Sequence, residues 1–479
     1  MTDELSRRRL LATGGVFAAA SLTAGPARSH AASARRAGAL AGPAVTRIGD
    51  TTLDPSGLYF LSYDGLVNIE SFQLSGILTH GSRQYAAWYT SSRHAVLARR
   101  SLPGGAWQSF TLPHQLSTND SHNVISLGVS PADGRLHVAM DTHNSTIWYT
   151  RSAAGQLGDA AWSAGRFETL QRTLGGLSLG SITYPQFVLA PNGRLQLSYR
   201  TGGSGNGVNR LAEYDGSWRA LGAWSGATGS YTARGVTSTT RNMYLHGLTY
   251  DTRGRLHAAF TWREGNSGVL CAAGGLANHD TGYVYSDDQG RTWRNSAGTQ
   301  VGTTGGTPVS VGSPGLVADP MTVDHGLMNQ EAQAADSAGR PHVIISYVPG
   351  RFTQCVSSYA AQRTSYARAF HVRRDASGTW RKTEIPFALN STGRSRLVFD
   401  ASDNAYVVLP FARIVAASAE SGWSDWRMLF DGAGLNAFGE CTVDYPRVAA
   451  EQVLSVMFQQ RSSGTAPSPV RVTDFRLGV

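Results

Sequence analysis

The chain has 479 residues, of which 41% are hydrophobic and 16% are charged. This composition excludes an intrinsically disordered protein and leaves enough apolar residues for a folded core. The formal net charge of +9 suits an acidic partner, although charge alone does not separate an acidic glycan from nucleic acid or anionic lipid.

Glycine and aromatic residues are abundant, with 55 glycines, 11 tryptophans and 18 tyrosines. Glycines supply turns and aromatic residues favour strands, so the composition predicts an all-β fold. No lysine-rich or arginine-rich run marks a nucleic-acid-binding stripe, and we expect no nucleic-acid partner.

The first residues have the pattern of an export signal. Arginines at positions 7 to 9 precede a small-residue apolar run over 12–20, and Ser29-His30-Ala31 resembles a cleavage site. The paired arginines are typical of a twin-arginine signal, and the apolar run is too short to span a bilayer. We therefore expect residues 1–31 to be removed and the protein to be secreted, with no membrane partner.

A short sequence motif recurs along the rest of the chain. Its glycines lie at positions 134, 193, 254 and 339, each followed by Arg and an alternating apolar run, and a weaker copy starts at Asp403. A turn residue followed by such a run predicts a β-hairpin.

The spacing of the motif indicates the architecture. The first two intervals are 59 and 61 residues and the third is 85, as the four glycine positions give. Repeats of about 60 residues with several short strands are typical of β-propellers. We predict a single seven-bladed β-propeller domain over residues 45–479, with an insertion at about 265–320.

Two further features of the repeat have structural roles in this interpretation. The segment from Ser286 to Trp293 reads S-x-D-x-G-x-T-W, the pattern of an Asp-box hairpin with a Trp packed beneath it. His137, His257 and His342 lie inside the repeated strands, so we interpret them as structural or supporting residues.

Candidate chemical residues lie at strand edges in three consecutive units. They are His122 and His143 in one unit, Tyr184 and Arg200 in the next, and Tyr244, His246 and Arg263 in a third. Blade loops of a propeller converge at one end of its axis, so these side chains can meet in one cleft. The chain lacks a G-x-S-x-G elbow, a P-loop and an H-E-x-x-H motif.

Several motifs together resemble the BNR-4 type propellers, in particular seven-bladed ulvan lyases and related enzymes acting on rhamnose–glucuronate linkages. The motifs are D-S-H-N at 120–123, D-x-H at 141–143, T-Y-P at 183–185, S-Y-R at 198–200 with the following G-G-S-G-N-G, N-H-D at 278–280 with the Asp-box, and G-L-M-N-Q at 326–330. The resemblance implies that Tyr184 is the catalytic acid/base and that His122 and His143 flank the scissile bond. It also implies that Arg200 binds a uronate carboxylate and that Tyr244 lines the subsite, and we add Asn123, His246 and Arg263 as substrate-binding candidates.

These residue types suit β-elimination from a uronic acid. The C5 proton is weakly acidic because the neighbouring carboxylate is anionic, and an arginine against that carboxylate offsets the charge that develops. A Tyr or His must remove this proton, and another group, or the same Tyr, must protonate the departing O4. The simpler interpretations are that these residues pack in the core and that Arg200 pairs with an acid.

The chain has three cysteines, Cys271, Cys355 and Cys441, too few for a disulfide framework. Cys271 and Cys355 with His279 fit a structural zinc site, as metal occurs in similar lyases, and a Cys271–Cys355 disulfide fits equally well. We expect no organic cofactor.

We therefore predict a secreted, monomeric polysaccharide lyase whose partner is an anionic polysaccharide, most simply ulvan or a rhamnose–glucuronate polymer. One alternative is an exo-acting rhamnosidase of the same fold, although hydrolases normally need paired carboxylates. The other alternative is a glycan-binding propeller that does not catalyse a reaction.

Overall fold

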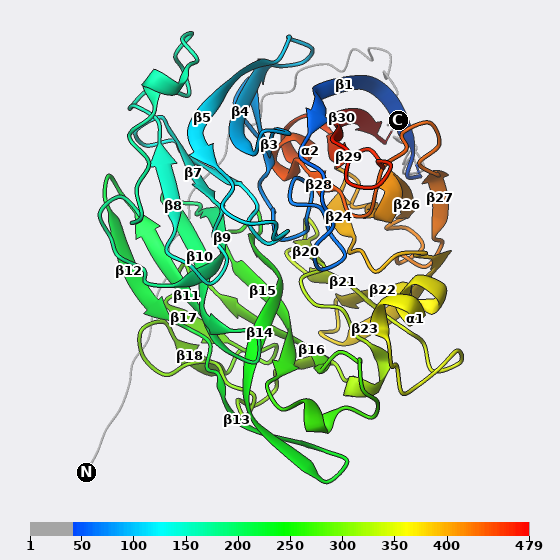
Figure 1. Cartoon of the computed structure of the whole chain (residues 1–479). Helices are drawn as coiled ribbons and strands as arrows, with labels where there is room; N and C mark the ends of the chain where they lie inside the picture. Colours follow the sequence, from blue (N-terminus) through cyan, green and yellow to red (C-terminus); the bar gives the residue numbers. More distant parts are fainter. Residues whose placement is uncertain (1–41, 479) are drawn as a thin grey trace, which may run out of the picture. The chain divides into compact units, whose positions relative to one another are not determined.

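Residues 42–478 are described in a computed structural model (Figure 1). The predicted signal at residues 1–31 lies outside the described residues. Over the described part, the chain forms seven antiparallel sheets and two short α-helices. The helices are α1 (Tyr359–Tyr366) and α2 (Tyr445–Glu451), and the 3-10 helices are η1 (Ala164–Arg166), η2 (Ser267–Val269), η3 (Val323–His325) and η4 (Pro410–Ala412).

The first three sheets follow one another along the chain. The first consists of β2 (Ile77–His80), β3 (Arg83–Tyr89), β4 (His94–Ser101) and β5 (Gln108–Gln115). The second consists of β6 (Ser126–Ser130), β7 (Arg135–Met140) and β8 (Trp148–Arg151). The third consists of β9 (Ile182–Leu189), β10 (Leu195–Gly203), β11 (Asn206–Tyr214) and β12 (Trp218–Ala223).

The fourth sheet is larger than the others. It consists of β13 (Thr228–Ala233), β14 (Val236–Tyr250), β15 (Leu256–Glu264), β16 (Asn278–Ser286), β17 (Thr292–Arg294), β18 (Gln300–Thr303) and β19 (Val317–Asp319). Strands β17 to β19 lie within the segment where the sequence predicts an insertion.

The last three sheets complete the chain. The fifth consists of β20 (Ala332–Ala335), β21 (Pro341–Tyr347), β22 (Arg368–Arg374) and β23 (Trp380–Ala388). The sixth consists of β24 (Arg396–Phe399), β25 (Ala405–Leu409), β26 (Arg413–Ala417) and β27 (Arg427–Phe430). The seventh consists of β28 (Thr442–Val443), β29 (Val453–Gln459), β30 (Ser468–Leu477) and β1 (Val45–Gly57).

In four of the sheets the repeated motif forms a hairpin turn. These turns join β6 to β7, β9 to β10, β14 to β15, and β20 to β21. The four glycines have φ angles of 67°, 80°, 86° and 69° at positions 134, 193, 254 and 339. This left-handed region costs glycine nothing and costs other residues steric strain, so the sequence uses glycine there. The predicted hairpins are therefore confirmed.

Apolar clusters join each sheet to the next and close the sheets into a ring. Each cluster contains side chains from two neighbouring sheets, for example Leu97 with Val138, Leu197 with Tyr149, Leu211 with Phe260, Ala259 with Val343, Ile344 with Val407, Val408 with Leu454, and Trp88 with Met457. The last sheet is also tied to the chain start, because β1 pairs with β30 as its outer strand. Burying each large apolar side chain stabilises this ring by about 1.5–3 kcal/mol.

The predicted all-β propeller is confirmed, but the sheets differ in their number of strands. Six of the sheets within residues 42–478 have the three or four strands of an ordinary blade, and the fourth sheet has seven. The 85-residue interval predicts the insertion that holds β17 to β19, but the spacing of the repeat does not reveal β13, which is added before the repeated hairpin. None of the helices in this part of the chain is long and apolar enough to cross a membrane.

The three repeat histidines lie in second strands and are buried. Nδ1 of His137 lies 2.7 Å from the Tyr149 hydroxyl, and Nδ1 of His257 lies 2.7 Å from the Tyr283 hydroxyl. His342 lies 2.8 Å from a ring nitrogen of His371. These contacts fasten neighbouring strands of one sheet, as expected for structural residues.

Candidate active site

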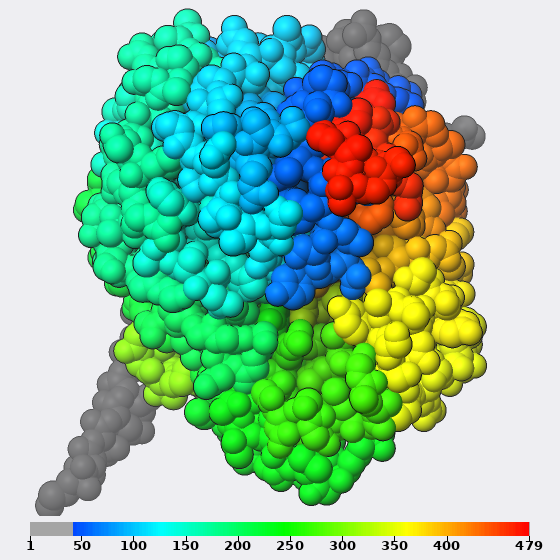
Figure 2. All heavy atoms as spheres, in the orientation of Figure 1, coloured from blue at the N-terminus to red at the C-terminus, as the bar shows by residue number. Residues whose placement is uncertain are grey.

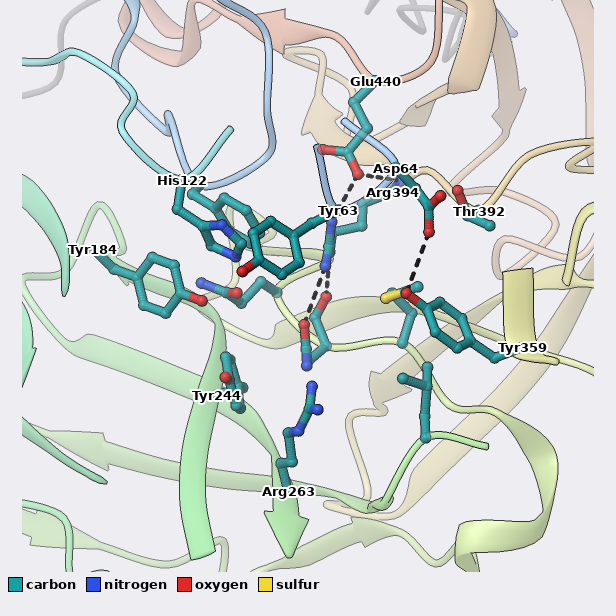
Figure 3. Close-up of a pocket in the computed structure, with 15 residues that line it drawn as sticks. Tyr63, Asp64, His122, Tyr184, Tyr244, Arg263, Tyr359, Thr392, Arg394 and Glu440 are labelled. Atoms are coloured by element: carbon teal, nitrogen blue, oxygen red, sulfur yellow. Dashed lines mark hydrogen bonds and ion pairs between the residues drawn. The ribbon is translucent and has the colours of Figure 1, made fainter. Parts of the chain in front are cut away.

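A pocket lies at the centre of the ring, and all seven sheets contribute to it from inner strand ends and adjoining loops. In Figure 2 the blue, green and yellow parts of the chain meet around this depression. The lining side chains, drawn in Figure 3, are Tyr63, Asp64, Phe72, His122, Tyr184, Tyr244, Arg263, Leu276, Met328, Asn329, Gln330, Tyr359, Thr392, Arg394 and Glu440.

Two histidines from adjacent loops share one carboxylate. The Asp120 side chain lies 2.7 Å from Nδ1 of His122 and 2.5 Å from Nδ1 of His143, and it also accepts the backbone N–H of His122 at 2.9 Å. The two imidazole rings stack with their centroids 4.3 Å apart. A neutral imidazole that donates through Nδ1 keeps its lone pair on Nε2, so both rings can offer a basic nitrogen away from Asp120.

The electrostatics keep His122 unprotonated and Asp120 ionised near pH 7. Burial lowers the pKa of His122 to about 4, despite the opposing effect of the hydrogen bond that its ring donates to Asp120, so the ring is neutral near pH 7. Burial raises the pKa of Asp120, but hydrogen bonds from His122 and His143 outweigh it and hold that pKa well below its usual range. Asp120 is therefore an anion beside two imidazoles.

Tyr184 reaches the pocket through a β-bulge. In the pairing of β9 with β10, Thr183 lies opposite Arg200 and Gln186 lies opposite Ser198, which leaves Tyr184 and Pro185 opposite the single residue Tyr199. Pro185 has no N–H to donate, and bulges are where a sheet accommodates proline. Tyr184 has a φ of 57°, a left-handed conformation that is rare for an aromatic residue.

Arg200 lies behind Tyr184 and is buried. Its guanidinium carbon is 4.8 Å from the centre of the Tyr184 ring, and it donates to the Tyr244 hydroxyl at 3.2 Å and to Asn144 at 3.3 Å. Its Nε is buried without a hydrogen-bond partner among the described residues. A small cavity lined by Tyr184, Arg200 and Tyr244 extends to this guanidinium.

The Tyr184 hydroxyl keeps its proton in this environment. Burial raises the pKa of its hydroxyl well above the usual value, the neighbouring Tyr244 adds to this, and Arg200 only partly opposes it. The pocket thus holds a neutral imidazole, a neutral phenol and a guanidinium side by side. This set can remove one proton and donate another next to an anionic group.

The wall formed by the fifth to seventh sheets is organised by Arg394, which sequence reasoning missed. Its guanidinium donates to Glu440 at 2.9 Å and to Glu70 at 3.2 Å, and its Nε donates to the Asn329 carbonyl at 2.7 Å. Its carbon lies 4.8 Å from the Phe72 ring, which stacks on His122 at 4.6 Å. Burial lowers the pKa of Arg394, but Glu440 and Glu70 outweigh burial and raise it.

Other side chains that sequence reasoning missed complete the pocket. The Tyr359 hydroxyl is 3.2 Å from Asp64, and the exposed ring of Tyr63 lies 4.5 Å from His122. Asp64 and Tyr63 precede Gly65 in a turn that the sequence signals, but no local pattern tells which turn faces the axis. These residues meet only once the ring is closed.

Most of the predicted site residues are brought together. His122, His143, Tyr184 and Arg200 form one cluster, and Tyr244 and Arg263 line the same pocket. Asp120 contacts both histidines, whereas Asp141 of the D-x-H motif contacts Ser117 and His114 and not His143.

Two predicted substrate-binding residues do not line the pocket. Asn123 is buried, and its amide points to Thr118. His246 is also buried and accepts the N–H of Glu331, and it lines a separate apolar cavity of the ring. Asn123 lies in the loop before β6, and His246 lies at a bulge of β14 between Leu245 and Gly247, so their substrate-binding roles stay predictions.

The predicted zinc set of Cys271, His279 and Cys355 is not assembled. Cys271 and Cys355 form a disulfide, which leaves no thiolate for a metal. Both ring nitrogens of His279 are engaged, one by Glu264 at 2.9 Å and the other by Asp280 at 3.0 Å. Within residues 42–478, the side chains whose ligand atoms lie close enough to hold a metal ion are Asp120, His122 and His143, with these atoms all within 4.8 Å of one another.

The sequence matches the model of the BNR repeat-containing family over residues 83–388, more than half of the chain. Two curated relatives are long isoforms of ulvan lyase. The protein from Pseudoalteromonas sp. (strain PLSV) is 26% identical over 267 residues, and the protein from Alteromonas sp. (strain LOR) is 24% identical over 267 residues. Each match covers 46% of this chain and 26% of the relative, so the chain spans about a quarter of the length of these relatives.

Solved structures of polysaccharide lyases share the fold. Polysaccharide lyase Uly1 superposes with a TM-score of 0.70 at 16% identity, covering 90% of this chain and 99% of that chain. A PL25 ulvan lyase bound to -[GlcA(1-4)Rha3S]- superposes with a TM-score of 0.61 at 12% identity, covering 89% of this chain and 95% of that chain. The family match and the shared fold agree, and this chain belongs to the BNR repeat-containing family.

Proposed function

We propose that this protein is a polysaccharide lyase that cleaves a uronate-containing glycan by β-elimination. The observation that carries the proposal is the cluster of His122, His143 and Asp120 beside Tyr184, with Arg200 behind the phenol. The ulvan lyase names of the relatives and the uronate-containing oligosaccharide in the PL25 structure support it.

In the proposed reaction, His122 Nε2 takes the proton from C5 of the uronate. The electron pair of the broken C5–H bond forms the C4–C5 double bond, the C4–O4 bond breaks, and Tyr184 gives its proton to O4. Asp120 stabilises the imidazolium that forms, as carboxylates do for catalytic histidines. Proton exchange between the imidazolium and the tyrosinate through solvent restores the starting state.

Arg200 receives the uronate carboxylate in this proposal. The small cavity behind Tyr184 leads to its guanidinium, and the buried Nε has no partner among the described residues. A carboxylate accepted there would satisfy that donor and offset the negative charge that develops at C5 in the transition state.

The state of the carboxylates favours elimination over the hydrolysis expected of a rhamnosidase. Glycoside hydrolases generally use two carboxyl groups that flank the glycosidic bond. In this pocket Glu440 is paired with Arg394, and Asp64 accepts from Tyr359. The groups next to Tyr184 are imidazoles and a guanidinium instead.

The substrate class that we propose is an acidic polysaccharide of the ulvan or rhamnose–glucuronate kind. The side chain of Arg263 lines the pocket, and its guanidinium makes no hydrogen bond or ion pair with the described residues. This arginine is therefore available to a negatively charged or hydroxyl-bearing sugar that neighbours the reacting uronate.

We also propose that the enlarged fourth sheet counts as one blade, so that the ring of seven sheets is a seven-bladed propeller.

We further propose that the protein is exported by the twin-arginine route and that it is a monomer. The Cys271–Cys355 disulfide supports export, because disulfides persist in oxidising compartments.

Digestion of ulvan in water labelled with a heavy oxygen isotope tests the reaction type. An elimination adds no water, so mass spectrometry should find unlabelled fragments, one of each pair carrying an unsaturated uronate. Labelled, saturated fragments would show hydrolysis. Binding without fragments would show a glycan-binding protein.

A further inference from the structure

Two large aromatic side chains are exposed beside helix α1, outside the central pocket. Phe352 is 41% exposed and Tyr366 is 42% exposed, and their rings stack with centroids 5.5 Å apart. Exposed apolar groups that gather in one place often mark a binding surface. We call Phe352, Tyr366 and Arg368 the outer platform.

Cationic side chains frame these rings. The guanidinium carbons of Arg351 and Arg368 lie 4.8 Å and 5.0 Å from the centre of the Phe352 ring. Arg351 is paired with Glu384, whereas Arg368 donates to the backbone carbonyls of Tyr366 and Ala367 and to no carboxylate of the described chain. The charge of Arg368 is thus not neutralised by an acid of the protein.

The outer platform is connected to the central pocket by one helix. Tyr359, which lines the pocket, is the first residue of α1, and Tyr366 is the last. At 1.5 Å per residue these two tyrosines are about 10 Å apart along the helix axis, the scale of a short stretch of polysaccharide. Figure 1 shows α1 beside β22 and β23 of the fifth sheet.

The helix is held in place from below. Arg363 in its middle is buried and donates to the carbonyls of Gly326 and Ser346, both at 3.0 Å. A cavity of about 560 Å³ opens beside the outer platform, and its lining includes Pro349, Gly350 and Arg351, the residues just before Phe352. A fixed aromatic surface next to open space can receive a ligand without first being ordered.

We propose that the outer platform is a second binding site for the acidic polysaccharide. It holds a part of the polysaccharide that extends beyond the central pocket. Aromatic rings offer flat apolar surfaces for the faces of sugar rings, and Arg368 offers a guanidinium for a carboxylate or sulfate. Because both sites would bind the same polymer, the outer platform raises the effective concentration of the polymer at the pocket. It does not increase the affinity for a fragment that is too short to reach both sites. This inference rests on the proposed function for its substrate.

The test compares polymer with fragment in the full-length protein. In the double variant Phe352→Ala/Tyr366→Ala we expect KM for ulvan to rise about tenfold, with kcat unchanged and with KM for ulvan tetrasaccharides unchanged. Arg368→Gln, which keeps the aromatic pair, should raise KM for ulvan in the same direction. Ile48→Ala, an exposed apolar residue at 45% on β1, serves as the matched control and should change neither value.

An equal change in KM for polymer and tetrasaccharide in the double variant, or no change in either KM, would contradict the proposal that the outer platform binds the polysaccharide. Retardation of the protein in gels containing ulvan gives a second measurement that needs no turnover. If the wild-type protein forms no unsaturated product, the proposed function fails and the gel alone decides: weaker retardation of the double variant than of Ile48→Ala supports the platform, and equal retardation contradicts it.

Discussion

Tyr184 combines an unusual backbone with an unusual side-chain environment. It occupies the left-handed region directly before a proline, where extended conformations are preferred. Such a conformation costs about 1–3 kcal/mol and persists where the surrounding structure imposes it. The bulge that imposes it also turns the phenol toward His122, at 5.8 Å between ring centres. Local strain and pocket geometry therefore have one cause.

Replacing Tyr184 by Phe removes the proposed acid and keeps the ring and the bulge. We expect kcat on ulvan to fall about 10²- to 10⁴-fold, because general acid catalysis contributes that much, with little change in KM. Tyr359→Phe removes a hydroxyl from the opposite wall and should affect KM more than kcat. Equal kcat values for Tyr184→Phe and wild type would rule out the phenol as the acid.

Asp120 fixes which nitrogen of each histidine faces the pocket. Asp120→Asn offers one acceptor oxygen where the carboxylate offers two, so at least one ring loses its orientation. We expect kcat to fall about 10²- to 10⁴-fold. Asp251→Asn changes a similar Asp–His pair, with His257 at 3.2 Å, outside the pocket and should leave kcat unchanged.

The pH dependence of kcat/KM tests whether Asp120 positions the His122 ring for catalysis or has only a structural role. His122 must be neutral to accept a proton, so in the wild type kcat/KM should fall as pH drops through about 4. The hydrogen bond that His122 donates to Asp120 raises the pKa of His122, and its loss should move this acidic limb to lower pH. An acidic limb at the same pH in Asp120→Asn would contradict the assignment of His122 as the base.

At the scale of elements, the disulfide joins two loops at the pocket rim. Cys271 precedes Leu276, and Cys355 precedes Tyr359, and both of those side chains line the pocket. The backbone N–H of Tyr359 also donates to the Gly274 carbonyl at 3.0 Å, so the two loops are tied twice.

Replacing both Cys271 and Cys355 by Ser should lower the free energy of unfolding by about 2–4 kcal/mol, since the bond closes a long loop. KM should rise, because the two rim loops lose their covalent link. Cys441→Ala, a change at the buried free cysteine, should lower stability without raising KM. Urea unfolding and steady-state kinetics measure both quantities, and an unchanged KM in the double variant would contradict the link to the rim.

Local elements of the fold could be predicted, and the opposite wall of the pocket could not. The hairpins at Gly134 and its repeats depend on four adjacent residues, so the sequence contains the signal. Tyr184 and His122 were found through short motifs at strand edges. Arg394 contacts Glu70 and Glu440, residues far away along the chain, and no spacing rule brings them together. The sequence does not decide between a zinc site and a disulfide for Cys271 and Cys355, because this depends on their distance in space.

At the scale of the whole molecule, the ring places seven loop sets around one axis and buries several imidazoles. Burial lowers the pKa of both His137 and His246 to about 3. The unfolded value is about 6.5, so below that pH the unfolded state binds more protons than the folded state. Stability should therefore be complete above pH 6.5 or so and decline as the pH falls toward about 3.

The variant His246→Asn tests this dependence on pH. Asn can still accept the Glu331 N–H but does not titrate, so the loss of unfolding free energy between pH 7 and about 4 should be smaller than in the wild type. Between pH 7 and about 4, a buried imidazole with this shift changes the free energy of unfolding by about 3 kcal/mol. Urea unfolding at both pH values measures it, and an identical loss in both proteins would contradict the role of His246.

The central claim is that the pocket eliminates rather than hydrolyses. The most direct measurement is the ultraviolet absorbance of ulvan and other uronate polymers during incubation with the purified protein. The account predicts that absorbance from the new C4–C5 double bond, conjugated with the carboxylate, rises with wild type and not with Tyr184→Phe. New reducing ends without any rise in absorbance would contradict it.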